Sequence, residues 1–133
     1  MRLISCILFA LCFLQGRAQL VLSTDSIGSR TISDNVYNKQ LFSDSLSTSF
    51  CIVIKKGVKA HKHVYHSEHV LVLEGEGMME LADKSFPIKK GDLIFIPKNT
   101  VHAVKTTSKE SLKVISIQAP LFNGNDRVFV EEK

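Results

Sequence analysis

Short hydrophobic runs, separated by Gly, Pro, Asn and Asp, divide the chain from residue 50 onward. The runs are rich in β-branched and aromatic residues, which is typical of strands. No window has apolar residues at i, i+3, i+4 and i+7 over the length of a helix. The pattern therefore predicts an all-β sandwich or barrel, with strands over residues 50–56, 58–65, 69–73, 78–82, 85–88, 92–96, 101–106, 112–118 and 127–130.

The residues between these runs predict tight turns. Gly75 and Gly77 join two runs, Gly91 precedes another, and glycine adopts the positive φ angles that such turns need. Residues 97–100, Pro-Lys-Asn-Thr, end one run and begin the next. Because the connections are too short for crossover helices, we expect antiparallel pairing.

The N-terminal segment has the layout of a signal peptide. Arg2 precedes an apolar stretch at 3–14, and the small residues Gly16 and Ala18 stand before a cleavage point after Ala18. Twelve residues at 3–14 are too few to span about 30 Å of hydrocarbon. We expect an exported protein, periplasmic or secreted, with no stable membrane anchor after cleavage; an uncleaved anchor or a lipoprotein signal are the alternatives. The polar segment 19–49 is expected to be an extension whose residues Val36, Tyr37, Leu41 and Phe42 form an edge strand, followed by a barrel over 50–133.

Composition narrows the classes of protein. The chain has 133 residues, a single-domain length, and a formal net charge of +4, which falls to about +2 without residues 1–18. No basic stripe is present, so we expect no nucleic acid as a partner. Of the three cysteines, Cys51 lies outside the leader and within an apolar run, which favours a small buried side chain over a nucleophile.

Four of the five histidines fall within residues 61–69. His61 and His63 share one face of a strand, Glu68 follows a predicted turn at residues 66–67, and His102 begins a later strand. Such a mixed nitrogen and oxygen set suits a transition metal. An exposed metal-scavenging cluster of histidines is the alternative. Tyr65 has the same strand parity as His61 and is a weak catalytic candidate, expected either to line the cavity or to pack.

Two motifs then indicate a family. Gly57-x3-His61-x-His63-x4-Glu68-x6-Gly75 resembles the first motif of the cupin superfamily, and Gly91-x5-Pro97-x-Asn99-x2-His102 is similar to the second, so the motifs span 57–75 and 91–106. The first glycine lies two residues nearer His61 than is usual, Thr106 replaces a terminal Asn, and Asn99 stands where Gly is commonest. Asn tolerates the left-handed conformation that this turn requires.

The resemblance implies a double-stranded β-helix, a jelly-roll barrel with a metal in its mouth. It makes His61, His63, Glu68 and His102 the ligands of a divalent transition metal (Mn, Fe, Ni or Zn), and it implies a homodimer that pairs through edge strands. Strand parity leaves His66 and His69 as surface residues.

Two functions remain open. One is a metal-dependent enzyme, dioxygenase-, decarboxylase- or isomerase-like, acting on a small substrate that chelates through oxygen. The other is a non-catalytic module that binds a metal or a small molecule. The cavity is expected to be mostly apolar, lined by Val70, Val72 and Val104, with Gln118 as a polar exception.

Overall fold

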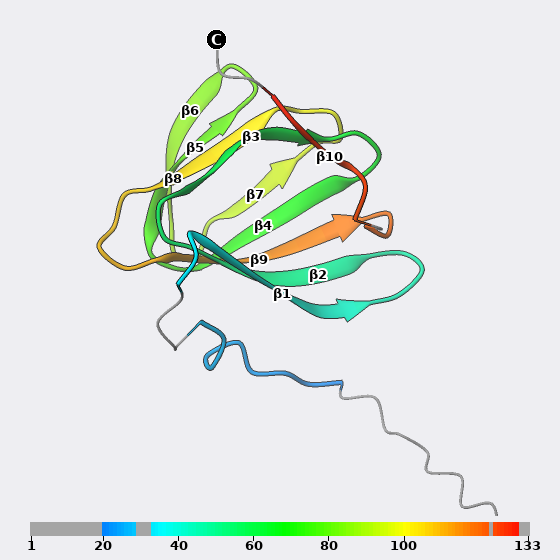
Figure 1. The fold of residues 1–133 in the computed structure, drawn as a ribbon, viewed down its shortest axis with the longest axis horizontal. Coiled ribbons are helices and arrows are strands. Elements are labelled where there is room, and N and C mark those ends of the chain that lie inside the picture. Colours follow the sequence, from blue (N-terminus) through cyan, green and yellow to red (C-terminus); the bar gives the residue numbers. More distant parts are fainter. Residues whose placement is uncertain (1–19, 29–32, 123, 131–133) are drawn as a thin grey trace, which may run out of the picture.

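The computed structural model describes residues 20–28, 33–122 and 124–130, and within them ten strands form two five-stranded antiparallel sheets (Figure 1). The first sheet has the order β1-β2-β9-β4-β7, with β1 Val36–Ser43, β2 Thr48–Ile54, β9 Leu112–Ala119, β4 Ser67–Glu74 and β7 Leu93–Ile96. The second has the order β10-β3-β8-β5-β6, with β10 Arg127–Phe129, β3 Gly57–His63, β8 His102–Thr106, β5 Glu76–Leu81 and β6 Lys84–Lys89. This confirms the predicted all-β jelly-roll barrel, a double-stranded β-helix.

The order of the strands shows how the fold closes. Strands far apart in sequence are neighbours, as β9 lies between β2 and β4, and β8 lies between β3 and β5. The four residues Val36, Tyr37, Leu41 and Phe42 all lie in β1, which is an edge strand as predicted. The predicted signal peptide, 1–18, lies outside the described residues. In the described ranges 20–28, 33–122 and 124–130, no helix is long and apolar enough to cross a membrane.

The core lies between the two sheets. Alternate residues of each strand point inward, and the buried hydrophobic cluster comprises Phe50, Ile52, Ile54, Val72, Met79, Ile88, Ile94, Ile96, Leu112 and Val114. Cys51 is also fully buried, as predicted, and burial raises the pKa of its thiol. A buried, protonated thiol is a poor nucleophile.

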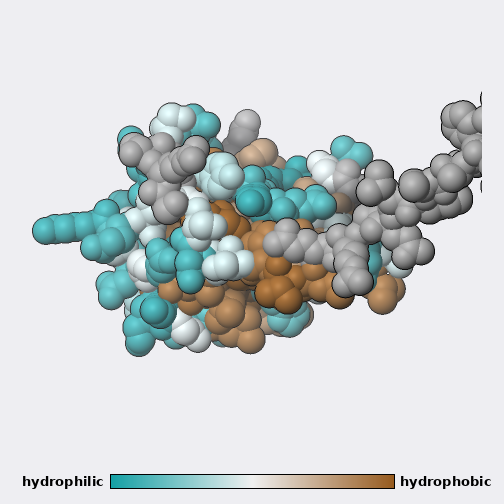
Figure 2. All heavy atoms as spheres, turned by 90° about the horizontal axis from the view of Figure 1, so that it is seen from below, coloured by the Kyte–Doolittle hydropathy of each residue, from teal (hydrophilic) through white to brown (hydrophobic). Residues whose placement is uncertain are grey.

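Hydrophobic side chains also reach the surface. Figure 2 shows them gathered in the middle of the face seen from below Figure 1, with hydrophilic residues around them. On the outer side of the first sheet, the cross-strand register aligns Leu93, Leu71 and Ile115 in one row. Phe95, His69 and Ile117 form the next row, and Leu93 and Phe95 are 66% and 53% exposed.

Asn99 adopts the conformation expected of it. Its φ angle is +61°, in the left-handed region, and its backbone N–H donates to the carbonyl of His63 at 2.5 Å. The turn before β8 is thereby attached to the end of β3. These are the two strands that contain the candidate metal-binding histidines, so the turn helps to set their separation.

Candidate metal centre

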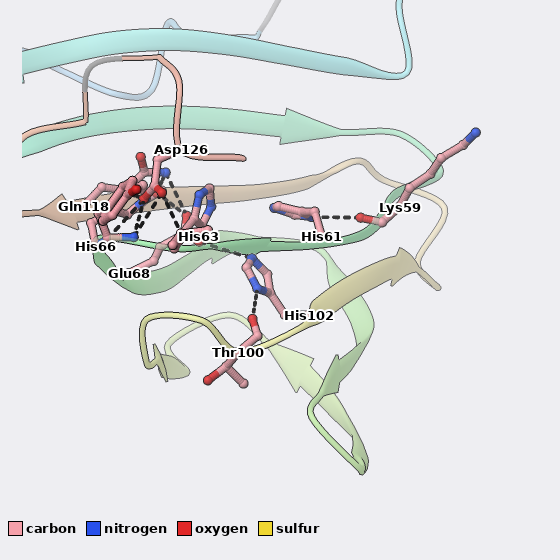
Figure 3. A network of polar contacts seen from close by, with 12 residues as sticks. Lys59, His61, His63, His66, Glu68, Thr100, His102, Gln118 and Asp126 are labelled. Atoms are coloured by element: carbon pink, nitrogen blue, oxygen red, sulfur yellow. Dashed lines mark hydrogen bonds and ion pairs between the residues drawn. The ribbon is translucent and has the colours of Figure 1, made fainter. Parts of the chain in front are cut away.

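Three strands bring the predicted ligands together inside the barrel (Figure 3). His61 and His63 lie two residues apart on β3. His102 lies on β8 and is the cross-strand partner of His61. Glu68 projects from β4 of the other sheet. Their side chains are nearly inaccessible, with exposed fractions between 2% and 6%. The alternative of an exposed histidine cluster is therefore wrong.

Local hydrogen bonds set the tautomers of two histidines. Nδ1 of His61 lies 2.8 Å from the carbonyl oxygen of Lys59, and Nδ1 of His102 lies 3.0 Å from that of Thr100. A carbonyl oxygen only accepts, so each Nδ1 has the proton and each Nε2 has a free lone pair. This is the arrangement in which a neutral imidazole binds a metal and in which the second nitrogen orients the ring.

Several buried nitrogens in this group lack a hydrogen-bond partner. Both nitrogens of His63 and Nε2 of His102 are inaccessible and unpaired within the described part of the chain. A buried polar atom without a partner costs about 1–3 kcal/mol. One ligand nitrogen from each of His61, His63 and His102 lies within 4.8 Å of the others. A metal ion between them would satisfy one nitrogen of His63 and Nε2 of His102, so the residues present fit a metal.

Glu68 completes the group from the opposite sheet. Its Oε2 lies 3.7 Å from Nε2 of His63 and 3.5 Å from Nε2 of His102. Two atoms that share a metal at about 2.1 Å each stand roughly 3.0–3.4 Å apart, so only a small contraction is needed. The geometry accommodates a mixed set of three nitrogens and one oxygen.

Two residues of β9 hold Glu68 in place. The hydroxyl of Ser116 donates to Oε1 of Glu68, and Nε2 of Gln118 lies 3.3 Å from the same oxygen. The other carboxylate oxygen is left facing the histidines. The side chain of Gln118 thus faces the interior as expected, but it binds the carboxylate of Glu68. Ser116 was not predictable from the sequence, because a serine in a strand has no distinguishing local pattern.

The electrostatics of the site favour metal binding. Burial is the main reason that the pKa of His61 and of His63 falls to about 4, so both imidazoles are neutral at pH 7. Burial alone would raise the pKa of Glu68, but the His102 imidazole, the Ser116 hydroxyl and the His63 imidazole lower it to about 2. Neutral imidazoles and an ionised carboxylate are the forms that bind a cation.

His66 was expected at the surface, and this is wrong. It is 2% exposed, its Nδ1 lies 2.5 Å from Oδ2 of Asp126, and its ring lies against that of His63 with centroids 4.2 Å apart. The reason is Asp126, whose carboxylate also accepts the backbone N–H groups of residues 64–66. Sequence reasoning missed Asp126, which lies in a polar segment with no motif.

His66 and Asp126 also form a second group with His63 that could hold a metal. Nδ1 of His66 is already bound to Asp126 at 2.5 Å, however, and this second group has three members, whereas the first has Glu68 as a fourth. The site of His61, His63, Glu68 and His102 is the better fit.

Tyr65 does not line the interior. Its side chain is 75% exposed, because the chain turns at residues 64–66 and the strand parity ends at His63. The expectation that it lines the cavity or packs is therefore wrong. His69, expected at the surface, is exposed.

A cavity of about 350 Å³ lies beside the histidines. His61, Glu68 and His102 line one part of it, and Val70 and Val104 line it as predicted, whereas Val72 is packed into the core outside the lining. Most of the remaining wall is aliphatic. A small molecule in this cavity would contact both the candidate metal ligands and an apolar surface.

Comparison with known proteins agrees with this geometry. The family model described as "Cupin domain" matches residues 50–118. An uncharacterized protein of Methanocaldococcus jannaschii is 35% identical over 71 residues, which is 53% of this chain and 57% of that protein. Quercetin 2,3-dioxygenase of Bacillus subtilis is 30% identical over 76 residues, 53% of this chain and 22% of the enzyme. The chain therefore spans about half of the first relative and a smaller part of the second.

A solved structure has the same fold. An uncharacterized conserved protein from Klebsiella pneumoniae, described as having a double-stranded β-helix domain, superposes with a TM-score of 0.74 at 16% identity. The match covers 86% of this chain and all of the other protein's chain. At this identity the likeness shows the fold alone.

Proposed function

Because the chain belongs to the cupin family, we propose that it binds one divalent transition metal and acts on a small molecule that coordinates the metal through oxygen. The metal would be Mn, Fe, Ni or Zn, and its ligands would be His61, His63, Glu68 and His102. The observation that supports this most directly is the set of buried, unpaired imidazole nitrogens facing one carboxylate oxygen.

The surroundings of the site support an open coordination position. His61, Glu68 and His102 line the cavity, so a molecule in the cavity would reach the metal from that side. A bound metal supplies Lewis acidity, or O₂ activation in the case of iron. The chain's own residues orient the ligands: Lys59 and Thr100 through their carbonyls, and Ser116 through its hydroxyl.

The cavity offers few acid–base groups, so the metal would contribute most of the chemistry. Among the described residues that line the cavity, the acid–base groups are Lys59 and the proposed ligands themselves. A dioxygenase-, decarboxylase- or isomerase-like reaction, in which the metal polarises the substrate, suits such a site. The similarity to quercetin 2,3-dioxygenase supports a dioxygenase as the first reaction to test.

The metal site is tested by elemental analysis of the purified protein and by titration of the metal-free form with each metal. We expect about one metal per chain, and a loss of at least about 100-fold in affinity for His102→Ala, because removal of a ligand should exceed the 10- to 100-fold effect of a supporting residue. His69→Ala is the matched control, since His69 is exposed on the outside of the barrel. Equal affinities of the two variants would refute the site.

The second candidate is a non-catalytic binding module. The lack of an acid–base group other than Lys59 and the ligands, among the described cavity residues, favours it. The two functions are separated by incubating the metal-loaded protein with diketones, polyphenols, thiols and keto acids. Turnover of any of these that His102→Ala abolishes supports the enzyme; binding without turnover across the panel supports the module.

We propose export to the periplasm or the exterior, based on the sequence at 1–18. Mass spectrometry of the mature protein should give a chain that begins near Gln19. A chain that begins at Met1 would refute cleavage, and a lipid-modified cysteine would favour the lipoprotein alternative.

We also propose that the protein is a homodimer that pairs through the outer side of the first sheet. The rows containing Leu93, Leu71 and Phe95 form an exposed apolar surface there. Lys113 of β9 forms an ion pair with Glu74 of β4 at 3.1 Å. Two copies that meet on this face would therefore not bring the charge of Lys113 together unpaired. Such a dimer would bury the outer face of the first sheet, whereas pairing along edge strands would join the sheet edges of the two copies.

Light scattering of Phe95→Lys tests this proposal. We expect the variant to be monomeric and the wild type dimeric at the same concentration. Met78→Lys is the control, because Met78 is 37% exposed on the second sheet. A monomeric wild type would refute the dimer, and a dimeric Phe95→Lys would refute the proposed surface.

A further inference from the structure

The cavity extends from the metal centre into an apolar interior. Its aliphatic wall includes Ile52, Ile54, Met79, Ile88, Leu112 and Val114. Glu68 is level with Gln118 in the sheet register, and Val114 lies four residues further along β9. At about 3.3 Å per residue, this places an apolar surface roughly 13 Å beyond the carboxylate along the strand.

This interior discriminates against polar ligands. The lining beyond the proposed metal ligands provides no polar side chain from β2, β5, β6 or β9 among the described residues. Each hydroxyl buried there without a partner would cost about 1–3 kcal/mol. Sugars and other polyols therefore do not suit the cavity, whereas hydrocarbon or aromatic groups do.

Lys59 and Arg127, the charged side chains at the opening of the cavity, are both positive. Lys59 and Arg127 line the cavity from β3 and β10, and Phe129 lies next to them with its ring 6.0 Å from that of His61. Glu68, the acidic residue in the lining, is already bonded to Ser116 and directed at the histidines.

The opposite side of the opening is neutral and held in place. Asn35 and Asn38 line it from the start of β1. The side-chain amide of Asn35 donates to the carbonyl of Gly57 at 2.7 Å and accepts from the N–H of Lys56 at 2.9 Å. These bonds attach the residue before β1 to the turn before β3.

We propose that the ligand of this cavity is an apolar monoanion: a carboxylic acid whose carboxylate lies between the metal centre and Arg127 and whose hydrocarbon or aromatic body fills the barrel. The position of the metal in this arrangement rests on the proposed function; the apolar interior and the cationic opening do not. The positive charge at the opening disfavours cationic ligands, and the cost of burying hydroxyl groups without partners disfavours polyols.

Calorimetric titration of the full chain, metal-free and metal-loaded, with butanoate, hexanoate and octanoate tests the proposal. Because each buried methylene contributes about 0.8 kcal/mol, we expect the affinity to rise about threefold to fourfold per methylene, with one site per chain. Octylamine, of the same length and opposite charge, should bind at least about tenfold more weakly than octanoate. This part uses the wild type, so it does not depend on the folding of a variant.

The role of the opening is tested by Arg127→Glu, which should weaken octanoate binding at least about tenfold. Lys84→Glu makes the same change of charge on exposed β6, outside the cavity lining, and should leave the affinity within about twofold. Equal binding of octylamine and octanoate, or no dependence on chain length, would overturn the proposal. Octanoate binding with the expected dependence in a protein that binds no metal would refute the proposed function and support this inference.

Discussion

Asp126 is predicted to hold the end of the metal-binding strand in position. Its carboxylate, 4% exposed, accepts the backbone N–H groups of Val64 at 2.8 Å, Tyr65 at 3.0 Å and His66 at 3.2 Å. It also binds Nδ1 of His66, whose ring packs against His63. The substitution Asp126→Asn keeps the size of the side chain but removes the charge and one acceptor oxygen.

The expected loss follows from these four contacts. A hydrogen bond to a charged group contributes about 1.5–3 kcal/mol, and an amide oxygen can still accept from about two of the donors. The remaining donors lose their partner, so we expect Asp126→Asn to lower the free energy of unfolding by about 2–4 kcal/mol. For a domain of this size, about 4 °C per kcal/mol gives a fall in Tm of roughly 8–16 °C.

The assay is thermal unfolding followed by circular dichroism, with Asp44→Asn as the control. The carboxylate of Asp44 also accepts two backbone N–H groups, from Leu46 and Ser47, but it lies in an exposed turn far from β3 in sequence. We expect its replacement to change Tm much less than Asp126→Asn does. At a temperature where Asp126→Asn is folded, its metal affinity should also be about 10- to 100-fold lower, because His63 loses its support through His66.

The same reasoning gives a pH dependence. Burial would raise the pKa of Asp126, but the three backbone N–H groups and the charge of His66 hold it below the ordinary value of 3.8. The stabilisation is thus present above pH 3.8 and is lost as the pH falls through the folded-state pKa. The difference in stability between wild type and Asp126→Asn should shrink in acid. A fall in Tm at neutral pH no larger than that of Asp44→Asn would refute the assigned role.

Two other predictions concern the metal centre. Ser116→Ala removes the hydroxyl that binds Glu68, so metal affinity should fall about 10- to 100-fold with little change in Tm; an unchanged affinity in a calorimetric titration would contradict this. In the metal-free protein, the pKa of His61 and His63 is about 4, below the ordinary 6.5, so the unfolded chain binds more protons between these values. The free energy of unfolding should therefore decrease as the pH falls from 6.5 towards 4, and a urea midpoint that stays constant over this range would show that the histidines are not desolvated.

The strands and turns were predictable because their determinants are local, and the jelly-roll topology followed from the resemblance to the cupin superfamily. Strand-forming runs and turn residues recur along the sequence, and each predicted run overlaps a strand in the structure, although the strand predicted over 58–65 ends at His63. The spacing of His61 and His63 also determines that they share a face, since side chains alternate along a strand. Asn99 was predictable as a left-handed residue from its place in a turn.

The residues that hold the proposed metal ligands in place were not predictable from local sequence patterns. Strand parity suggested that Tyr65 faces inward and His66 outward, and both are reversed because the chain leaves the strand after His63. The cause lies 60 residues away in Asp126, which binds the turn. Likewise, Ser116 reaches Glu68 because β9 is placed beside β4.

The sequence by itself determined the strands and the turns, because each follows from the conformation of a few neighbouring residues. The four side chains proposed as metal ligands followed from the resemblance of two sequence motifs to those of the cupin superfamily. Only the tertiary structure decided which polar groups hold those ligands and where the cavity opens. Hydrogen bonds between strands distant in sequence depend on how the two sheets close, and no local pattern records that closure.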